Sequence, residues 1–181
     1  VTERATAITQ FLVERGAKAV VVACNTATAI AVESLRARFA IPIVAIEPAV
    51  KPAASRSRSR VVGVLATTGT VSSPNMAKLL ANCGGVAAPL QPWPGLADQV
   101  EKGELASLET RALVERYVRP LTEKGADILV LGCTHYPFLR PLIQEVAGPG
   151  VDIIDPATAV ARELRRRLEA GGLIRERTEQ G

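Results

Sequence analysis

Two short apolar segments that each end in a cysteine constrain the fold of this chain more than any other feature. Residues 20–26 read VVVACNT, and residues 129–135 read LVLGCTH. Each has the length and composition of a buried strand, and each cysteine is followed by small polar residues of the kind that begin a helix. The sequence therefore predicts two buried strands whose ends carry Cys24 and Cys133.

The surroundings of the two cysteines repeat in register. Gly16 precedes Cys24 by as many residues as Gly125 precedes Cys133, and an acid-proline pair follows each segment, at 47–48 and at 155–156. Chance similarity between two buried strands is the alternative interpretation. Because the spacing holds over several landmarks, we favour an internal repeat of strand, cysteine, helix, strand and acid-proline.

Composition places the chain among globular α/β proteins. It has 181 residues, of which 48% are hydrophobic and 22% charged, and helical patterns alternate with the apolar strands. No apolar run approaches the ~20 residues that span a bilayer, and no segment resembles a signal peptide, so we expect a cytoplasmic protein with no membrane partner. The net charge of +4 suits an acidic small molecule as well as a polymer.

Periodicity, capping residues and breakers predict seven helices and six strands, one of the helices being a short one after the loop at 92–96. The other six helices are expected at 2–15, 27–39, 74–83, 108–123, 137–146 and 156–170. The strands are expected at 19–23, 43–46, 61–65, 86–90, 129–133 and 151–154. Residues 51–60, with the run SRSRSR, are interpreted as a solvated connector between lobes rather than a nucleic-acid arm, because aromatic residues are absent. Residues 175–181 are expected to form a frayed tail.

Three cysteines without a Cys-x-x-Cys pair predict neither a disulfide framework nor a zinc site, so no metal or cofactor is expected. Cys83 falls inside a predicted helix and is interpreted as a structural thiol. Trp93, the only tryptophan, is interpreted as a packing residue rather than a ligand contact.

The other two cysteines lie where ligands bind. In parallel α/β sheets this is beyond the carboxyl ends of the strands, where helices begin. A thiol there experiences the partial positive charge of the helix N-terminus, which favours the thiolate. Free backbone N–H groups, together with Asn25, Thr26 and Thr134, would form a cradle for carboxylates.

Two thiols in repeat-related positions suit one reaction in particular. If the two halves face each other across a pseudo-twofold axis, the thiols approach one ligand from opposite sides. Racemisation needs a base on one face of a carbon and an acid on the other, and a thiol can serve as either. His135, the only histidine, follows Cys133 closely and could polarise that thiol or bind a substrate carboxylate.

These motifs are similar to those of the glutamate racemases, within the cofactor-independent aspartate/glutamate racemase superfamily. The resemblance is carried by residues 23–29 (ACNTATA) and 131–137 (LGCTHYP), with support from the Thr67 to Thr70 loop and from residues 94–96 (PGL). The Thr-His-Tyr-Pro continuation favours glutamate over the aspartate and hydantoin relatives. The similarity runs over nearly the whole chain.

The resemblance implies two pseudo-symmetric α/β lobes with parallel sheets and the active site between them. The first lobe would comprise 1–50 plus 155–181, and the second 51–154. Cys24 would act on the α-proton of D-glutamate and Cys133 on that of L-glutamate, and the product would supply peptidoglycan synthesis. The implied substrate contacts are Asn25, Thr26, Thr67, Thr70, Thr134 and His135.

The chain departs from the family at its ends. The family opens with a strand carrying Asp-Ser-Gly and a Pro-Tyr-Gly loop, and neither occurs here. The family's closing segment after the last helix is also absent. We therefore expect an internal fragment with an incomplete first lobe, exposed apolar surface and little or no activity. Its expected partners are glutamate and, as the candidate assembly, a second copy in a homodimer, with no nucleic acid.

Four alternatives are weighed against glutamate racemisation. One is an aspartate or other amino-acid racemase of the same superfamily. Another is a Cys-His hydrolase with Cys133 as nucleophile and His135 as base, which leaves Cys24 without a role. The third is a non-catalytic α/β module that binds a carboxylate between its halves. A metal site formed by Cys24, Cys133 and His135 is disfavoured because the ligand spacing is not short.

Overall fold

The computed structural model describes residues 1–174, and it divides into two compact units, called unit 1 and unit 2. Unit 1 comprises Val1–Ile46 and the segment from Ala157 onward, and unit 2 comprises Glu47–Pro156. The tail predicted at 175–181 lies outside the described residues. The assignment of 1–50 with 155–181 and of 51–154 to two racemase lobes stays a prediction.

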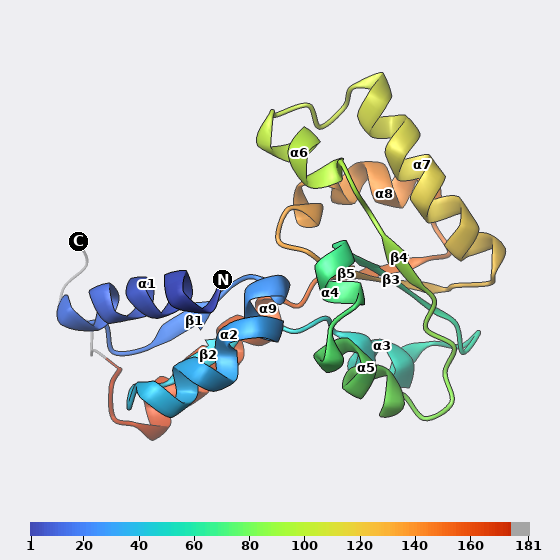
Figure 1. Cartoon of the computed structure of the whole chain (residues 1–181). Coiled ribbons are helices and arrows are strands. Elements are labelled where there is room, and N and C mark those ends of the chain that lie inside the picture. The colour runs from blue at the N-terminus through green and yellow to red at the C-terminus, as the bar shows by residue number, and fades with distance from the viewer. Residues whose placement is uncertain (175–181) are drawn as a thin grey trace, which may run out of the picture. The chain divides into compact units, whose positions relative to one another are not determined.

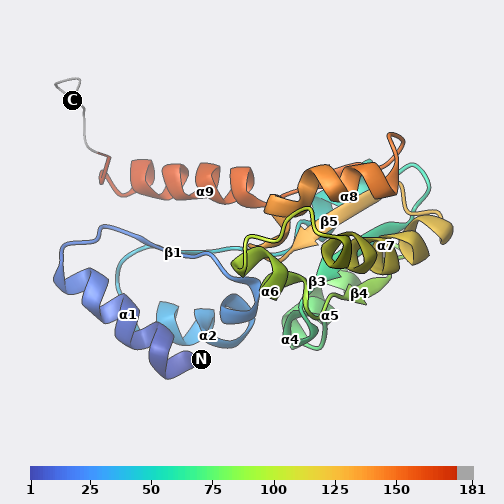
Figure 2. The same cartoon turned by 90° about the horizontal axis from the view of Figure 1, so that it is seen from above.

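Unit 1 is a small parallel α/β unit (Figure 1). Its elements are α1 (Thr2–Glu14), β1 (Val20–Val22), α2 (Asn25–Arg38), β2 (Ile43–Ala45) and α9 (Ala157–Ala170). The two strands are parallel, with Val20 opposite Ile43 and Val22 opposite Ala45. Figure 2 shows α1 and α2 on one side of these strands and α9 on the other. The strand-helix-strand order is the one predicted around the first cysteine.

The core of unit 1 lies between α2 and the sheet. Val32 and Leu35 from α2 pack with Val20 and Ile43 from the strands, and all four are buried. Helix α9 contains no buried residue among those described. Arg165 of this helix pairs with Glu169, and Arg166 and Arg167 pair with Glu163.

Unit 2 is built on a parallel sheet in the order β4-β3-β5-β6. Its strands are β3 (Val62–Ala66), β4 (Leu90–Pro92), β5 (Ile128–Gly132) and β6 (Asp152–Ile154). Its helices are α3 (Val50–Arg56), α4 (Thr68–Val71), α5 (Pro74–Ala81), α6 (Leu96–Glu101), α7 (Leu108–Glu123), the 3₁₀ helix η1 (Tyr136–Leu139) and α8 (Arg140–Ala147). The prediction of an α/β fold with parallel sheets is confirmed.

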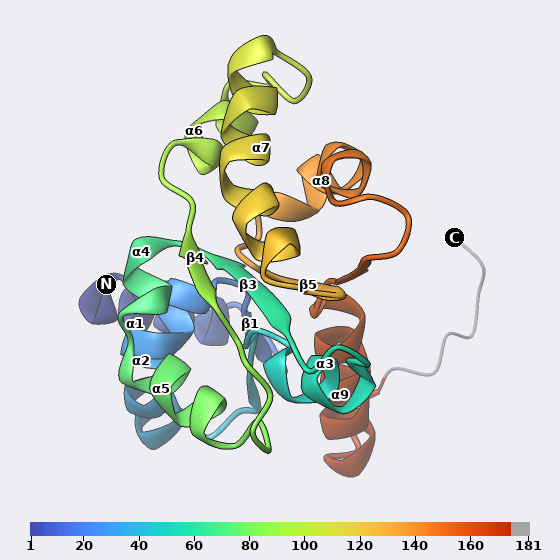
Figure 3. The ribbon, with the colours of Figure 1, turned by 90° about the vertical axis from the view of Figure 1, so that its right-hand side faces the viewer.

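Both faces of this sheet are covered by helices (Figure 3). Val64 and Val130 pack on the side of α3 and α5, whereas Leu129 and Leu131 pack with residues of α6, α7 and α8. A parallel strand that is buried on both faces has no polar alternation, which is why β3 and β5 are continuous apolar runs in the sequence.

The connector predicted at 51–60 is wrong for its first half, which forms α3. Val50 and Ala53 are fully buried, and their spacing of three residues places them on one face of a helix. Pro52 stands in the first turn of α3, where a backbone N–H would have no helical partner. The proline is therefore compatible with a helix here.

The edge strand predicted at 86–90 lies slightly later, at Leu90–Pro92. Just before it, Ala87 forms a parallel bridge with Val61, because the Ala87 N–H donates to the Arg60 carbonyl and the Val62 N–H donates to the Ala87 carbonyl. The Val64 N–H then donates to the Pro89 carbonyl. Pro89 itself has no N–H to return a bond, and proline in a sheet is typical of an edge strand. The edge position was predicted correctly, and only the bounds were not.

Asp127, just before β5, forms hydrogen bonds to the residues between α3 and β3. Its carboxylate accepts hydrogen bonds from the Ser57 hydroxyl at 2.6 Å, the Arg58 N–H at 2.7 Å and the Ser59 N–H at 2.9 Å. Partial burial would raise the pKa of Asp127, but the bonds from Ser57, Ser59 and Arg58 outweigh it and lower the pKa to about 2. The ionised carboxylate is thus the form that the fold prefers.

Replacing Asp127 by asparagine is expected to lower the free energy of unfolding by about 1 kcal/mol at neutral pH, because a charged acceptor is lost. A depressed folded pKa gives stability that is present above the unfolded value of about 4 and is lost as the pH falls through the folded value. The difference in the free energy of unfolding between the wild type and Asp127→Asn should therefore shrink between about pH 4 and 2. Urea denaturation at several pH values measures this difference. The control is Asp98→Asn, because Asp98 is an exposed acid. An equal effect of both substitutions would contradict the role of Asp127.

Candidate active site

Cys24 stands between the end of β1 and the start of α2. Its backbone is extended, with φ −142° and ψ 120°, and it is the residue that caps α2. Its carbonyl accepts the first helical bond, from the Thr28 N–H at 2.8 Å, and its thiol-bearing side chain is exposed. The strand places the thiol at the carboxyl edge of the sheet, and the helix N-terminus begins immediately behind it.

Asn25, the residue after this cysteine, has a side-chain amide that lacks hydrogen-bond partners within residues 1–174. It is buried, with 4% of its surface exposed, and neither its amide oxygen nor its amide nitrogen has a hydrogen-bond partner among the described residues. A buried amide without partners costs free energy, on the order of 1–3 kcal/mol per group. Such an amide is suited to bind a polar group that arrives from elsewhere. Thr26 follows it in the first turn of α2 and is partly buried.

In unit 2, the chain after β3 carries the threonines of the predicted loop. Residues 68–71 form the single-turn helix α4, where a loop was expected. Thr67 caps it by accepting the Thr70 N–H at 3.3 Å, and the two hydroxyls are 3.0 Å apart. Because Ala66 pairs with Gly132, Thr67 and Cys133 leave neighbouring strands at the same edge of the sheet.

Cys133 follows the last residue of β5, and the main chain fixes its position. The preceding Gly132 lies so close to β3 that a Cβ atom there would stand 2.8 Å from the Leu65 carbonyl oxygen and 3.0 Å from the Ala66 Cβ. A larger residue would push the two strands apart. Cys133 itself is partly buried, and its neighbour Thr134 is partly buried as well.

His135 lies between the thiol of Cys133 and a carboxylate. Its Nδ1 is 3.6 Å from the Cys133 Sγ, and its Nε2 is 2.6 Å from the Glu101 Oε1. A carboxylate can only accept, so Nε2 carries the proton, and Nδ1 is left as an acceptor toward the thiol. The three groups form a relay along which the thiol proton can be held or moved.

Sequence reasoning missed Glu101. It ends α6, and 34 residues separate it from His135. No local pattern links the two positions, because α6 and η1 meet only through the packing of unit 2. The sequence offered one signal for Glu101. It is a carboxylate at the end of a helix that follows β4, a strand of the sheet that also contains β5.

The neighbouring Tyr136 has a structural role. It is fully buried and stacks on Trp93, with ring centroids 5.0 Å apart. Burial raises the pKa of the Tyr136 hydroxyl above its usual range, and the negative charge of Cys133 raises it further. The phenol therefore stays neutral beside the thiol. Trp93 is 2% exposed, which agrees with its predicted packing role, and Cys83 is buried as expected.

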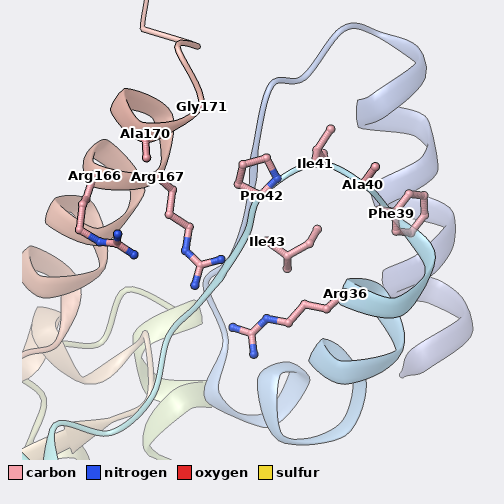
Figure 4. Close-up of a pocket in the computed structure, with 10 residues that line it drawn as sticks. All are labelled: Arg36, Phe39, Ala40, Ile41, Pro42, Ile43, Arg166, Arg167, Ala170 and Gly171. Atoms are coloured by element: carbon pink, nitrogen blue, oxygen red, sulfur yellow. The ribbon is translucent and has the colours of Figure 1, made fainter.

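A pocket of about 680 Å³ in unit 1 is a different feature (Figure 4). Arg36 from α2 and Arg167 from α9 reach into the space between these helices, over a floor that includes Pro42 and Ile43. The guanidinium of Arg36 pairs with Glu33 at 3.2 Å and that of Arg167 with Glu163 at 2.7 Å. The predicted site residues, all of which are described, do not line this pocket.

Residues 1–174 contain no group of three or more His, Cys, Asp or Glu side chains placed to hold a metal ion. Within the same residues, no helix combines the length and the apolar character that crossing a membrane requires. The structure thus assembles two clusters: Cys24 with Asn25 and Thr26 in unit 1, and Cys133 with Thr67, Thr70, Thr134, His135 and Glu101 in unit 2.

The family model and the sequence relatives that match this chain point to the same family of racemases. The sequence model described as Asp/Glu/Hydantoin racemase matches residues 2–164. A glutamate racemase of Methylococcus capsulatus is 53% identical over 182 residues, covering 100% of this chain and 67% of that protein. One of Herpetosiphon aurantiacus is 51% identical over 175 residues, covering 96% of this chain and 69% of that protein.

Solved structures agree with the sequence relatives. The crystal structure of Escherichia coli glutamate racemase in complex with L-glutamate and the activator UDP-MurNAc-Ala superimposes with a TM-score of 0.84 at 32% identity, covering 93% of this chain and 65% of that one. This chain therefore spans about two thirds of the length of the proteins it matches. By sequence and by fold, the chain belongs to the Asp/Glu/hydantoin racemase family.

Proposed function

We propose that this protein serves in the interconversion of L-glutamate and D-glutamate, with Cys24 and Cys133 as the two acid/base groups. Glutamate is the substrate named for its relatives. Each thiol follows a parallel strand at the carboxyl edge, where a substrate α-carbon can be approached. The observation that carries the proposal is the relay from Cys133 through His135 to Glu101, with contacts of 3.6 Å and 2.6 Å.

The relay supplies what proton transfer at carbon needs. Nδ1 of His135 can accept the thiol proton, which leaves a thiolate able to take the α-proton of L-glutamate. The carboxylate of Glu101 stabilises the imidazolium that forms. On the other face, the Cys24 thiol returns a proton to the carbanion and gives D-glutamate. In the reverse direction Cys24 acts as the base and Cys133 as the acid.

The remaining predicted residues would hold the substrate. The partner-free amide of Asn25 can donate to one carboxylate and accept from the ammonium group. The backbone N–H groups at the start of α2 would add donors for a carboxylate, and Thr26, Thr67, Thr70 and Thr134 would add hydroxyls. The D-glutamate formed would supply peptidoglycan synthesis in a bacterial cytoplasm.

We further propose that residues 1–181 alone turn over little or no glutamate. The relatives are about half as long again as this chain, and the buried amide of Asn25 has no partner among the described residues. A substrate held on part of its surface reacts slowly, since orientation supplies much of the rate. The homodimer expected for the protein also stays a prediction.

The test is α-proton exchange. L-Glutamate is incubated in deuterium oxide with this chain and, in parallel, with a chain extended by the segments of a relative, and the products are followed by proton NMR and chiral chromatography. The extended chain should form D-glutamate that carries deuterium at the α-carbon. Absence of both exchange and inversion in an extended chain that is folded would refute the proposal.

Replacing Glu101 by glutamine is expected to lower kcat/KM about tenfold, because the amide keeps a hydrogen bond to Nε2 but loses the charge that stabilises the imidazolium. The equilibrium constant between two enantiomers is one, so kcat/KM must fall equally in both directions. Steady-state kinetics from each enantiomer checks this. Replacing Glu104, an exposed acid of the same loop region, is the control, and an equal loss there would argue against a relay.

The same relay also favours a second candidate, a hydrolase that uses Cys133 as nucleophile. A thiol, an imidazole and a carboxylate in sequence are the arrangement of such enzymes. The two candidates differ over Cys24. Cys24→Ser should abolish inversion of glutamate in the racemase, whereas a hydrolase acting on ester substrates should retain its activity in that variant.

A further inference from the structure

Two tyrosine hydroxyls bind consecutive carbonyl groups in the turn that begins α6. The Tyr117 hydroxyl donates to the Pro94 carbonyl at 3.1 Å. The Tyr136 hydroxyl donates to the Trp93 carbonyl at 3.4 Å. Tyr117 belongs to α7, whereas Tyr136 begins η1 and directly follows His135. The turn between β4 and α6 is therefore held from two sides by residues that are far from it along the chain.

The side chains of Trp93, Tyr117 and Tyr136 also pack on one another, and we call them the aromatic cluster. The Trp93 ring lies 5.7 Å from the Tyr117 ring and 5.0 Å from the Tyr136 ring, measured between centroids. All three side chains are buried. Helix α7 gives the cluster a firm base, because Val114 and Val118 of this helix are fully buried in the same core.

Helix α6 does not fix its own direction. It has six residues, Leu96–Glu101, and so short a helix is marginal without tertiary contacts. It begins at Gly95, whose φ of 84° is left-handed, and a glycine can adopt many other backbone angles. Contacts from the rest of unit 2, including the bonds from the two tyrosine hydroxyls, therefore set the direction in which α6 leaves the sheet.

The contact between Glu101 and His135 depends on that direction. The Glu101 side chain is 73% exposed, so packing around the carboxylate does not hold it in place. Its Oε1 nevertheless lies 2.6 Å from the His135 Nε2. An exposed acid loses rotamer entropy when it is held in a single geometry. The position of the Glu101 backbone therefore decides how often this contact forms.

We propose that Tyr117 is a positioning residue of the relay, because its hydroxyl fixes the start of α6 so that Glu101 meets His135. Tyr136 holds the same turn from the side of the histidine. Both tyrosines act through the contact between Glu101 and His135 rather than on the substrate. Their effect on turnover rests on the proposed function, whereas their effect on the contact itself does not.

Proton NMR of the histidine ring tests the positioning without turnover. His135 is the only histidine of the chain, so its Nε2–H signal can be assigned directly. A hydrogen bond to the Glu101 carboxylate slows exchange of this proton with water. Tyr117→Phe keeps the ring and removes the bond to Pro94, an exposed residue whose carbonyl can bond to water instead. We expect the proton to exchange about threefold faster in this variant than in the wild type.

Thr122→Val is the matched control. It also removes a hydroxyl of α7 that donates to a carbonyl, that of Arg119 at 3.0 Å, but it leaves the turn before α6 intact. Glu101→Ala gives the exchange rate of a ring without the carboxylate. If Tyr117→Phe does not fold, Tyr136→Phe provides the same test. A wild-type rate in the folded tyrosine variant, or equal acceleration in the control, would overturn the proposal.

Kinetics of the extended chain show through which group Tyr117 acts. Tyr117→Phe should lower kcat/KM from both enantiomers about threefold. In a Glu101→Ala chain the same substitution should have no further effect, because no carboxylate is left to position. A purely structural role would multiply the two effects, and that result would overturn the proposal. An extended wild type that turns over no glutamate would refute the proposed function, and the exchange rates would still decide the positioning.

Discussion

Replacing Cys133 by serine in the extended chain is expected to lower racemisation in both directions by a factor on the order of 10²–10⁴, the usual contribution of one positioned acid or base. Each turnover needs a proton removed on one face and another delivered on the opposite face, so the loss of either group stops inversion. Serine preserves the size of the side chain, but its hydroxyl is a far weaker acid than a thiol. Cys24→Ser should have the same effect on inversion.

The two variants should differ in exchange without inversion. In deuterium oxide, Cys133→Ser should still introduce deuterium at the α-carbon of D-glutamate, because Cys24 is the group that we propose acts on that enantiomer. Cys24→Ser should do so for L-glutamate. Cys83→Ser is the control, since this buried thiol donates to the Leu79 carbonyl at 3.1 Å and takes no part in the reaction. If either active-site variant kept wild-type inversion, the two-thiol mechanism would be wrong.

Replacing Trp93 by alanine is expected to lower the free energy of unfolding by about 3–5 kcal/mol, the usual cost of removing a buried aromatic side chain. Trp93 lies between two rings, with centroids 5.7 Å from Tyr117 and 5.0 Å from Tyr136. Deletion would leave a cavity below the helices that cover β3 and β5. Urea denaturation followed by circular dichroism measures the change.

Trp93→Phe is the matched comparison. It retains an apolar ring in the cluster and removes the indole N–H, which is buried and has no hydrogen-bond partner among the described residues. The loss of that unsatisfied donor offsets part of the smaller packing volume. We expect a cost below half of that for Trp93→Ala. Equal costs for the two substitutions would show that the aromatic cluster does not carry the stability.

The strands that position the thiols were predictable from sequence for a definite reason. β3 and β5 are covered on both faces, so their residues are apolar without interruption, and the caps at Ser73 and Ser107 mark the helices α5 and α7 as expected. Leu108, however, is 87% exposed although it is apolar. It is the first residue of α7, where periodicity gives little information about burial.

The sequence could not predict contacts between residues that are far apart along the chain. Residues 50–56 were assigned to a connector because serine, arginine and proline dominate, and it is the burial of Val50 and Ala53 that makes a helix there. Glu101 joined the site only through the packing of α6 against η1. Similarly, Asp127 looked like an ordinary acid before a strand, and only folding brings Ser57 to it.

The close approach of Gly132 to Leu65 and Ala66 has a consequence for redesign of the specificity. Because the backbone of two neighbouring strands sets the position of the Cys133 thiol, that position does not depend on the side chains that surround the ligand. We expect that substituting Thr67 or Thr134, which we propose as substrate contacts, changes the preferred dicarboxylic amino acid while the Cys133 sulfur stays where it is. Selection for new substrates should start from those hydroxyls and leave the glycine unchanged.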